Sequence, residues 1–327
     1  MADKKRRITS VDVAREAGLS RATVSFVLNN TPGQSIPEAT RQRVLQAAAR
    51  LGYTPYAPAR TLRSGRSDVA LFVLPDWPQG HTMAALVDRA AQVLGEAGLT
   101  LITHVHAGHD DELARLWSAL SPAAVFGMRP FTAEELEAMR RVRIPAVLPP
   151  SEQPGYDVSD TLWINGVGRL QARHLIAKGH ERLAYVLPDD PRLAALGRGR
   201  AQGAAQACAE AGLPEPVVST IAMDAGSAAE AVASWRGVPT AVCAYHDEVA
   251  LALLAGMRVL GTSLPVIGAD DIPAARFAVP PLTTVAQDSG EIGEHIARAL
   301  LRALNEEDPG LDLLPADVIH VVERESA

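Results

Sequence analysis

The chain has 327 residues, of which 47% are hydrophobic and 21% are charged, so it is long enough for two or three domains with buried cores. The sequence contains no run of about 18 uncharged apolar residues, so we expect no membrane span. The charged residues after Met1 argue against a secretory signal. The 2 cysteines, Cys208 and Cys243, give neither a disulfide framework nor a paired metal-binding spacing. We therefore expect a globular cytoplasmic protein.

Charge is divided unevenly along the chain. The net charge is −7, but residues 1–66 hold 12 lysines and arginines against 4 acidic residues, and the rest of the chain holds 19 against 34. A basic head on an acidic body is expected when one domain meets nucleic-acid phosphates and the other does not. A solvated basic tail would have the same composition, so charge alone favours DNA only weakly.

The basic head begins with two short predicted helices. Thr9 and Asp12 have capping-box spacing, which predicts a helix that ends at Ala17, and Gly18 supplies the turn. Ser20 can cap a second helix over residues 20–29. Its apolar stripe consists of Val24, Val27 and Leu28.

A third helix follows after a short loop. Ser35 is placed as its cap, Pro37 as a helix-starting residue and Glu38 as the capping-box acid. The apolar face of this helix consists of Val44, Leu45, Ala48 and Leu51. Three short helices with a tight turn between the first two predict a helix-turn-helix. Spacing alone does not separate this module from a generic three-helix bundle with a basic surface.

The residues of this head resemble those of one family. The run from Ile8 to Asn29, ITSVDVAREAGLSRATVSFVLN, is similar to the headpiece of the lactose-repressor and galactose-repressor family of transcription regulators. In that family the second helix enters the major groove. The resemblance implies base contacts from Arg21 and Ala22, because arginine can pair with guanine and an alanine methyl can meet a thymine methyl. The side chains implied to position this helix on DNA are Thr9, Ser20, Thr23, Ser25 and Asn29.

The resemblance continues through the segment after the headpiece. It implies that Tyr56 to Arg63 form a hinge helix on DNA, with contacts from Ala59, Arg60 and Leu62. The leucine would wedge between central base pairs in the minor groove. A plain linker is the alternative, because the prolines and glycine of this segment suit one equally well.

From Asp68 onward, short apolar runs alternate with segments of helical periodicity, which predicts a mostly parallel sheet. A body of this length suits two lobes. The predicted strands are Val69–Leu74, Leu99–Val105, Ala123–Phe126, Ala146–Leu148, Leu183–Leu187, Ala241–Ala244, Pro265–Gly268 and Val318–Glu323. The resemblance agrees, so the expected fold is an all-α helix-turn-helix headpiece with an α/β two-lobed, periplasmic-binding-protein-like body.

These segments divide the chain into a headpiece, a hinge and two lobes. The expected boundaries are 1–52 for the headpiece, 53–67 for the hinge, 68–162 with 289–312 for the N-terminal lobe, and 163–288 with 313–327 for the C-terminal lobe. No leucine heptad follows the last strand, which favours a homodimer over a tail-mediated tetramer. A twofold dimer requires an approximately palindromic operator in double-stranded DNA.

The cleft between two such lobes is the expected place for a small-molecule effector. The resemblance implies contacts from Arg200 and Asp270, because a guanidinium fork and a carboxylate can orient hydroxyls or a carboxylate. Alternatively, Asp270 caps a helix and Arg200 forms a salt bridge between the lobes. A tryptophan could stack on a ring, although core packing is its more frequent use. The predicted effector residues are Asp76, Trp77, Trp163, Arg200, His246 and Asp270.

Several residues depart from the family pattern at positions that read DNA or ligand. Phe26 stands where the family usually has arginine, and it cannot donate to guanine, so the operator sequence cannot be transferred. Trp163 to Gly166 replace an Asp-Asn pair of sugar-sensing members, and His246 replaces a frequent asparagine. Sugar hydroxyls need dense hydrogen-bonding partners, so these losses weaken a sugar assignment.

Enzymatic functions find little support in the sequence. It contains no phosphate-binding glycine loop, nucleophile elbow or zinc-binding His-Glu helix. The residues His104, His106, His109, Asp110 and Asp111 suggest a metal site, but their place at a strand end and loop favours solvated surface. We therefore expect no catalytic residues, no metal and no cofactor.

Together these features predict a sequence-specific repressor of a catabolic or transport operon. Its operator affinity would depend on an effector between the lobes, such as a sugar or sugar derivative. Two alternatives stay open: a DNA-binding member that has lost effector sensing, and a solute-binding protein with a basic arm.

Overall fold

The structure is a computed structural model that describes residues 8–28, 34–53, 67–149 without 107, 109 and 130, 165–310 and 318–327. It divides into two compact units between Ser67 and Asp68. The hinge segment Tyr56 to Arg63 lies outside the described residues, as do Asn29 and Trp163. Within the described residues, no helix has the length and apolar character needed to cross a membrane.

The headpiece consists of α1 (Ser10–Ala17), α2 (Arg21–Leu28) and α3 (Glu38–Leu51). The Asp12 carboxylate accepts hydrogen bonds from the Thr9 N–H at 2.9 Å and the Thr9 hydroxyl at 2.7 Å. Ser20 Oγ accepts from the Thr23 N–H at 3.1 Å, so both predicted caps are confirmed. The small core consists of Val13, Ala14, Ala17, Val24, Val27, Val44, Ala47 and Ala48.

The start of the third helix differs from the prediction. The N–H groups of Thr40 and Arg41 donate to the carbonyl of Pro37, at 2.9 and 3.0 Å, so Pro37 is the residue before the first turn. Residues 34–37 are not helical, which places Ser35 too early to cap α3. Spacing could not choose between Ser35 and Pro37, because a proline φ near −60° suits both extended and helical backbone.

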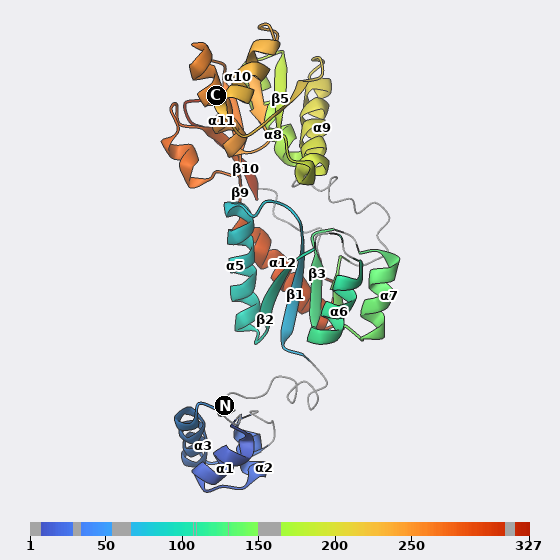
Figure 1. The fold of residues 1–327 in the computed structure, drawn as a ribbon, viewed down its shortest axis with the longest axis vertical. Coiled ribbons are helices and arrows are strands. Elements are labelled where there is room, and N and C mark those ends of the chain that lie inside the picture. Colours follow the sequence, from blue (N-terminus) through green and yellow to red (C-terminus); the bar gives the residue numbers. More distant parts are fainter. Residues whose placement is uncertain are drawn as a thin grey trace, which may run out of the picture. The chain divides into compact units, whose positions relative to one another are not determined.

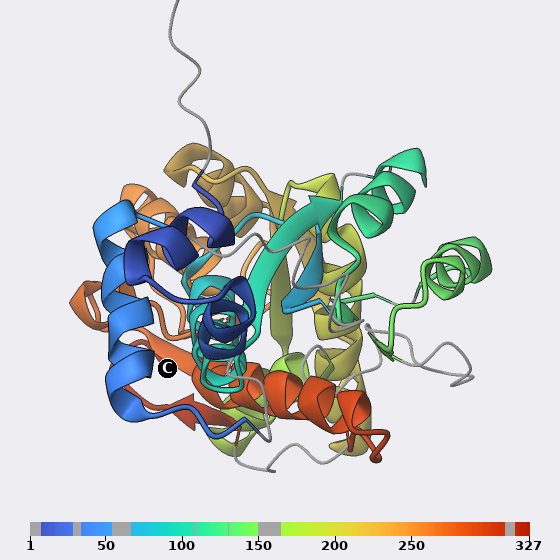
Figure 2. The ribbon, with the colours of Figure 1, turned by 90° about the horizontal axis from the view of Figure 1, so that it is seen from below.

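The N-terminal lobe contains a parallel sheet of strand order β2-β1-β3-β4. Its strands are β1 (Val69–Pro75), β2 (Thr100–His106), β3 (Ala124–Gly127) and β4 (Ala146–Leu148). Its helices are α5 (His81–Glu96), α6 (Asp110–Leu120), α7 (Ala133–Arg141) and α12 (Ser289–Leu304). Alternate residues of β1 serve different faces: Phe72 packs in a cluster with α5 and α12, and Val73 packs in a cluster with α6 and α7. Helix α12 lies beside α5 in both views of the ribbon (Figures 1 and 2).

The C-terminal lobe contains a sheet of order β10-β9-β8-β7-β5-β6. Its strands are β5 (Leu183–Pro188), β6 (Val217–Ile221), β7 (Ala241–Ala244), β8 (Val266–Ala269), β9 (Thr283–Gln287) and β10 (Ile319–Val322). Its helices are α8 (Asn165–Ala177), α9 (Ala194–Glu210), α10 (Ala225–Ser234) and α11 (Asp247–Leu260), with 3-10 turns at Pro191–Leu193 and Pro273–Phe277. Only β10 runs antiparallel to its neighbour in this described sheet. Every predicted strand is present, with each end within one residue of its expected place.

The chain crosses between the lobes over very short distances. Strand β9 of the C-terminal lobe ends at Gln287, and α12 of the N-terminal lobe begins at Ser289. On the return, Val318 is buried in the core of the N-terminal lobe, and the next residue opens β10. Val318 was expected in the other lobe, so the return crossing lies a few residues later than predicted.

Two glycines allow α8 and α9 to pack closely. A Cβ at Gly168 would lie 1.8 Å from the backbone oxygen of Arg200, and a Cβ at Gly203 would lie 2.0 Å from the backbone oxygen of Asn165. Neither backbone oxygen can move as a flexible side chain could. The position of Arg200 in the lobe therefore depends on a glycine in the neighbouring helix.

We expect Gly168→Ala to lower the free energy of unfolding by about 1–3 kcal/mol, because the added methyl forces α8 and α9 apart. Gly95→Ala is the matched control, since this glycine also lies in a helix and a Cβ added there would meet nothing beyond its own helix backbone within 4 Å. That change should be neutral or stabilise by up to about 1 kcal/mol through helix propensity. Urea unfolding followed by circular dichroism measures the free energy of unfolding of both variants. Equal effects of the two substitutions would show that the contact between α8 and α9 tolerates a methyl group.

Candidate functional site

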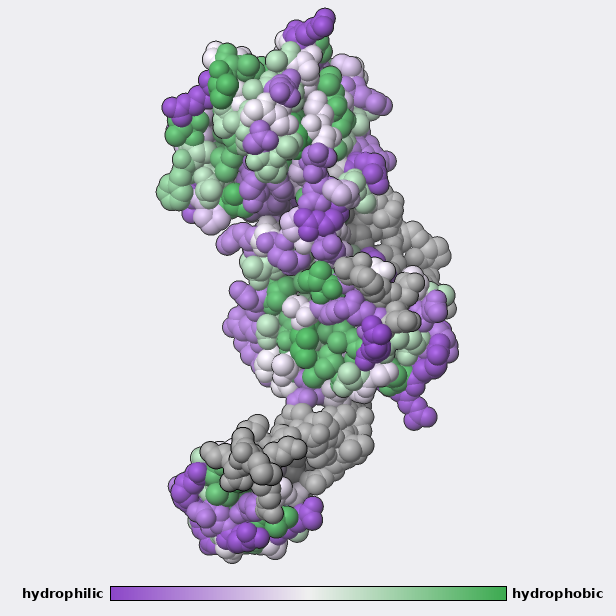
Figure 3. All heavy atoms as spheres, in the orientation of Figure 1, coloured by the Kyte–Doolittle hydropathy of each residue, from purple (hydrophilic) through white to green (hydrophobic). Residues whose placement is uncertain are grey.

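Helix α2 presents a mixed small and polar surface on the side away from the headpiece core. Val24 and Val27 are buried, whereas Arg21 and Ala22 are exposed. The predicted DNA-positioning residues Thr23 and Ser25 are half-buried, as is Phe26, while Thr9 and Ser20 are exposed at the helix starts. The visible face of the headpiece in Figure 3 is mostly hydrophilic. The structure thus brings the predicted headpiece residues that it describes to the surface.

Arg21 differs from the other described arginines of the headpiece. Arg15 and Arg41 pair with acids one turn away in their own helices, at 3.7 and 3.9 Å, and Arg50 lies 3.1 Å from Glu16. Arg43 donates to the carbonyl of Ala17 at 2.8 Å, at the end of α1. Within the described part of the headpiece, Arg21 has no such partner. Its guanidinium is therefore available to an external acceptor.

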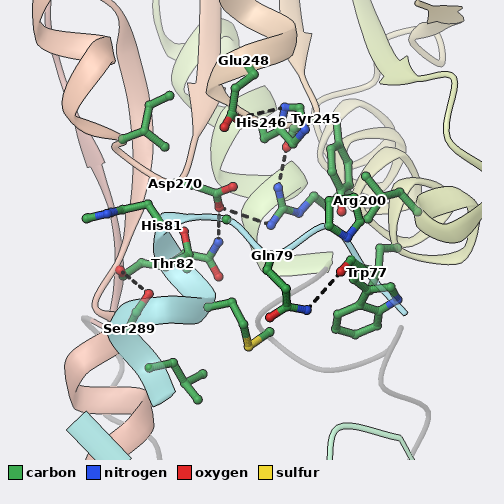
Figure 4. A pocket seen from close by; sticks show the side chains of 18 of the residues that line it. Trp77, Gln79, His81, Thr82, Arg200, Tyr245, His246, Glu248, Asp270 and Ser289 are labelled. Atoms are coloured by element: carbon green, nitrogen blue, oxygen red, sulfur yellow. Dashed lines mark hydrogen bonds and ion pairs between the residues drawn. The ribbon is translucent and has the colours of Figure 1, made fainter. Parts of the chain in front are cut away.

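A cavity of about 310 Å³ lies between the two lobes of the body. The N-terminal lobe contributes residues 77–83, together with Leu86, Met128, Ser289 and Ile292. The C-terminal lobe contributes side chains that follow the carboxyl ends of β7 and β8 and others from α9 (Figure 4). The volume is at the lower end of the range for small-molecule sites, which is about 300–1,000 Å³. Because the lining comes from both lobes, an occupant would contact both.

Arg200 and Asp270 form the polar centre of this cavity. Arg200 is 8% exposed, and its Nη2 lies 3.5 Å from Asp270 Oδ1. Its Nη1 donates to the backbone oxygen of Tyr245, and its guanidinium carbon lies 4.6 Å from the centre of that ring. Gln287 Nε2 donates to Asp270 Oδ1 at 2.6 Å. Arg200 Nε is buried and has no hydrogen-bond partner among the described residues.

The geometry does not agree with the two alternative roles, a helix cap for Asp270 and a salt bridge between the lobes for Arg200. Asp270 follows β8 with a φ of 98°, and the next helical turn begins at Pro273 after Ile272, so Asp270 caps no helix there. Arg200 pairs with an acid of its own lobe rather than across the cleft. Both residues of the pair belong to the C-terminal lobe and line the cavity.

The turn that carries Asp270 is fixed by a buried carboxylate. Asp247 accepts a hydrogen bond from the Ile272 N–H at 2.8 Å and from the Thr284 hydroxyl at 2.6 Å. Burial raises the pKa of Asp247 to about 7, and the two hydrogen bonds oppose this rise. Arg324 donates to the carboxylate of Asp271 at 2.6 Å. Asp270 is therefore held in place by contacts to the two residues that follow it.

Gln171 of α8 contacts the carboxyl ends of β7 and β8. Its Nε2 donates to the backbone oxygens of Ala244 and Gly268, at 2.7 and 2.8 Å, and its Oε1 accepts from the Tyr185 hydroxyl at 2.9 Å. A buried amide with three satisfied bonds fixes the separation of two neighbouring strands. The residues after β7 and β8 are thereby kept at the cavity edge.

The other predicted effector residues have different positions. His246 lines the cavity, but its Nδ1 accepts from the Val249 N–H at 3.1 Å, and burial lowers the pKa of this imidazole. Trp77 lines the cavity and packs against the core of the C-terminal lobe (Figure 4). Asp76 does not line it; its carboxylate lies 3.7 Å from Arg192 of the other lobe. Trp163 lies outside the described residues.

The sequence analysis missed several polar lining residues, among them Tyr245 and Gln287. Tyr245 directly follows β7, so the rule that ligands sit beyond strand ends could have identified it. Gln287 ends β9, a strand that was not predicted, and its role depends on the crossing to α12.

Two family models match this chain. Residues 9–56 match the model described as bacterial regulatory proteins of the lacI family, and residues 172–327 match a periplasmic binding protein-like domain. The first covers the headpiece, and the second covers most of the C-terminal lobe.

Relatives match over nearly the full length. The chain is 30% identical over 306 residues to the HTH-type transcriptional regulator DegA of Bacillus subtilis, covering 88% of each chain. It is 33% identical over 298 residues to GalS of Salmonella typhimurium, covering 85% of this chain and 84% of that relative. Among solved structures, a lac repressor dimer bound to operator and the anti-inducer ONPF has a TM-score of 0.76 at 21% identity, with 98% and 99% coverage. A complex of the regulator CelR with cellobiose has a TM-score of 0.62 at 26% identity, with 98% and 100% coverage.

The sequence match to DegA, the headpiece model and the shared two-lobed fold lead to one assignment. The chain belongs to the lacI family of bacterial regulatory proteins, and it is a DNA-binding transcriptional regulator with a helix-turn-helix headpiece and a two-lobed effector-binding body.

Proposed function

We propose that this regulator is a cytoplasmic homodimeric repressor whose affinity for a pseudo-palindromic operator changes when a small molecule occupies the cavity between its lobes. The observation that carries the proposal is the cavity itself, because its lining comes from both lobes and contains the Arg200–Asp270 pair. A ligand bound there stabilises one arrangement of the lobes over another. The ligand is bound and released without turnover.

The headpiece supplies operator recognition. Arg21 and Ala22 contact base edges from the start of α2, because these side chains are exposed and the arginine is unpaired within the described residues. The side chains that position the helix are Thr9, Ser20, Thr23, Ser25 and Asn29. The hinge adds contacts from Ala59, Arg60 and Leu62 in the minor groove. The lac repressor dimer bound to operator supports this arrangement by its similar fold.

The cavity favours a ligand with one compact polar group and one apolar or ring portion. Arg200, Asp270 and Gln287 form the polar end, with the unpartnered Arg200 Nε beside them. Leu86, Met128 and other apolar side chains line the remainder, together with Trp77. The cellobiose complex of CelR supports a sugar or sugar derivative. A glycoside with an apolar substituent would use both ends of the cavity.

Arg21→Ala should weaken binding to the operator about 5- to 150-fold, equivalent to roughly 1–3 kcal/mol, because one base contact is lost. Arg50→Ala is the matched control, since Arg50 is also an exposed headpiece arginine but is paired with Glu16. Its effect should stay within about threefold. Fluorescence anisotropy with the palindrome nearest the regulator's own gene, at several salt concentrations, measures both dissociation constants. Equal losses for the two variants would assign the effect to charge rather than to base recognition.

Asp270→Asn should raise the effector's dissociation constant about tenfold or more, because a charged hydrogen-bond partner in a buried site is lost. The effector is first found by thermal shift of the full chain across mono- and disaccharides, alkyl and aryl glycosides, nucleosides and small carboxylic acids. Asp189→Asn is the control, since Asp189 is exposed and does not line the cavity. If operator binding is tight and no compound shifts the unfolding temperature, the protein is a regulator without effector sensing.

A further inference from the structure

Two imidazoles and a carboxylate converge at the edge of the N-terminal lobe's sheet. His104 and His106 lie on β2, the edge strand, in register with Val73 and Pro75 of β1. Alternate residues of a strand point to the same face. Val73 packs in the cluster with α6 and α7, so both histidines lie on that face.

The side chains of this face change from apolar to metal-binding in character toward the end of β2. Ile102 packs in the same cluster as Leu113 and Trp117 of α6. One and two alternations further on, the strand carries His104 and His106 instead of aliphatic residues. Glu112, in the first turn of α6, brings a carboxylate to the same place.

The distances are those of a nearly assembled metal site. His104, His106 and Glu112 each offer one ligand atom, and these atoms lie within 4.8 Å of one another. His104 Nε2 lies 3.6 Å from Glu112 Oε1. Around a tetrahedral zinc ion with bonds of about 2.0–2.1 Å, ligand atoms are roughly 3.4 Å apart. Small side-chain rotations would close the site.

Two ring nitrogens of these histidines lack hydrogen-bond partners. His104 Nε2 and His106 Nδ1 are buried atoms that have no hydrogen-bond partner among the described residues. An unpartnered buried nitrogen costs free energy, and metal coordination removes that cost when the nitrogen is a ligand. Glu135, another acid of this lobe, is not available as a metal ligand because its carboxylate is already hydrogen-bonded. It accepts two hydrogen bonds from Arg129, at 3.0 and 2.6 Å, and one from the Thr132 N–H at 2.8 Å.

We propose that His104, His106 and Glu112 bind a divalent transition-metal ion, with zinc as the natural candidate. Two imidazoles and one carboxylate are a common donor set for zinc, and they leave a coordination position open to water or another ligand. The ion would join the end of β2 to the first turn of α6. The site is separate from the effector cavity, whose lining includes none of these three residues.

The test uses the full-length protein, stripped of metal with a chelator and titrated with Zn²⁺ in a calorimeter. One ion per chain should bind saturably to the wild type. His104→Gln and His106→Gln should each weaken binding about tenfold or more. His320→Gln is the matched control, because His320 is exposed on β10 of the other lobe. No saturable binding by the wild type, or unchanged binding in both β2 variants, would overturn the proposal.

A spectroscopic measurement decides the question if a variant fails to fold. X-ray absorption of the zinc-loaded wild type should show nitrogen and oxygen ligands with imidazole scattering and no sulfur, because both cysteines are buried in the C-terminal lobe. A sulfur ligand, or an ion surrounded by water oxygens alone, would refute the assignment. Operator binding and the effector response are measured on the same samples, so failure of the metal site is distinguishable from failure of the proposed function.

Discussion

The ion pair between the buried Arg200 and the half-buried Asp270 is the interaction on which the cavity between the lobes depends. Arg200 is 8% exposed, so its guanidinium must be compensated for its lost hydration. The Asp270 carboxylate, the Tyr245 carbonyl and the Tyr245 ring provide that compensation. The position of each residue of the pair depends on other contacts in the lobe. The helix of Arg200 approaches α8 closely because residues 168 and 203 are glycines, and Asp270 stays in its turn because Asp247 and Arg324 hold the two residues that follow it. The cavity's polar end is therefore a product of the whole C-terminal lobe.

The sequence was sufficient to predict most strands because the central strands of this body are short apolar runs bounded by turn residues. Ala241–Ala244 was predicted with its observed ends, since burial on both faces leaves a continuous apolar signal. Strand β6 was missed because it is an edge strand whose residues are mostly exposed. Strand β9 was missed because it begins with two threonines, which are buried through hydrogen bonds to partners far away in the chain.

The candidate site was predicted less completely than the fold, for reasons that are physical. Arg200, His246, Asp270 and Trp77 line the cavity, but Asp76 does not, although it is adjacent to Trp77 in the chain. Asp76 lies in a bend after β1 that is closed by a hydrogen bond from the Trp77 N–H to the Pro75 carbonyl, so the side chains of Asp76 and Trp77 point in different directions. Only the position of Arg192 in the other lobe shows which way Asp76 turns. The histidines of β2 show the same limit. Their place at a strand end and loop favoured solvated surface, and the acids considered with them were Asp110 and Asp111, whereas the carboxylate that lies near the imidazoles is Glu112.

The contacts of Asp270 also suggest how an occupied cavity could affect the rest of the molecule. Gln287 donates to Asp270, and Gln287 is the last residue of β9, with only Asp288 between it and α12 of the other lobe. A ligand that donates a hydrogen bond to Asp270 competes with Gln287 for the same oxygen. That competition occurs where the chain crosses between the lobes. The Asp76–Arg192 pair is a second contact between the two lobes. A bound molecule therefore acts on the segment that connects the lobes, where a small change in geometry can alter the angle between them.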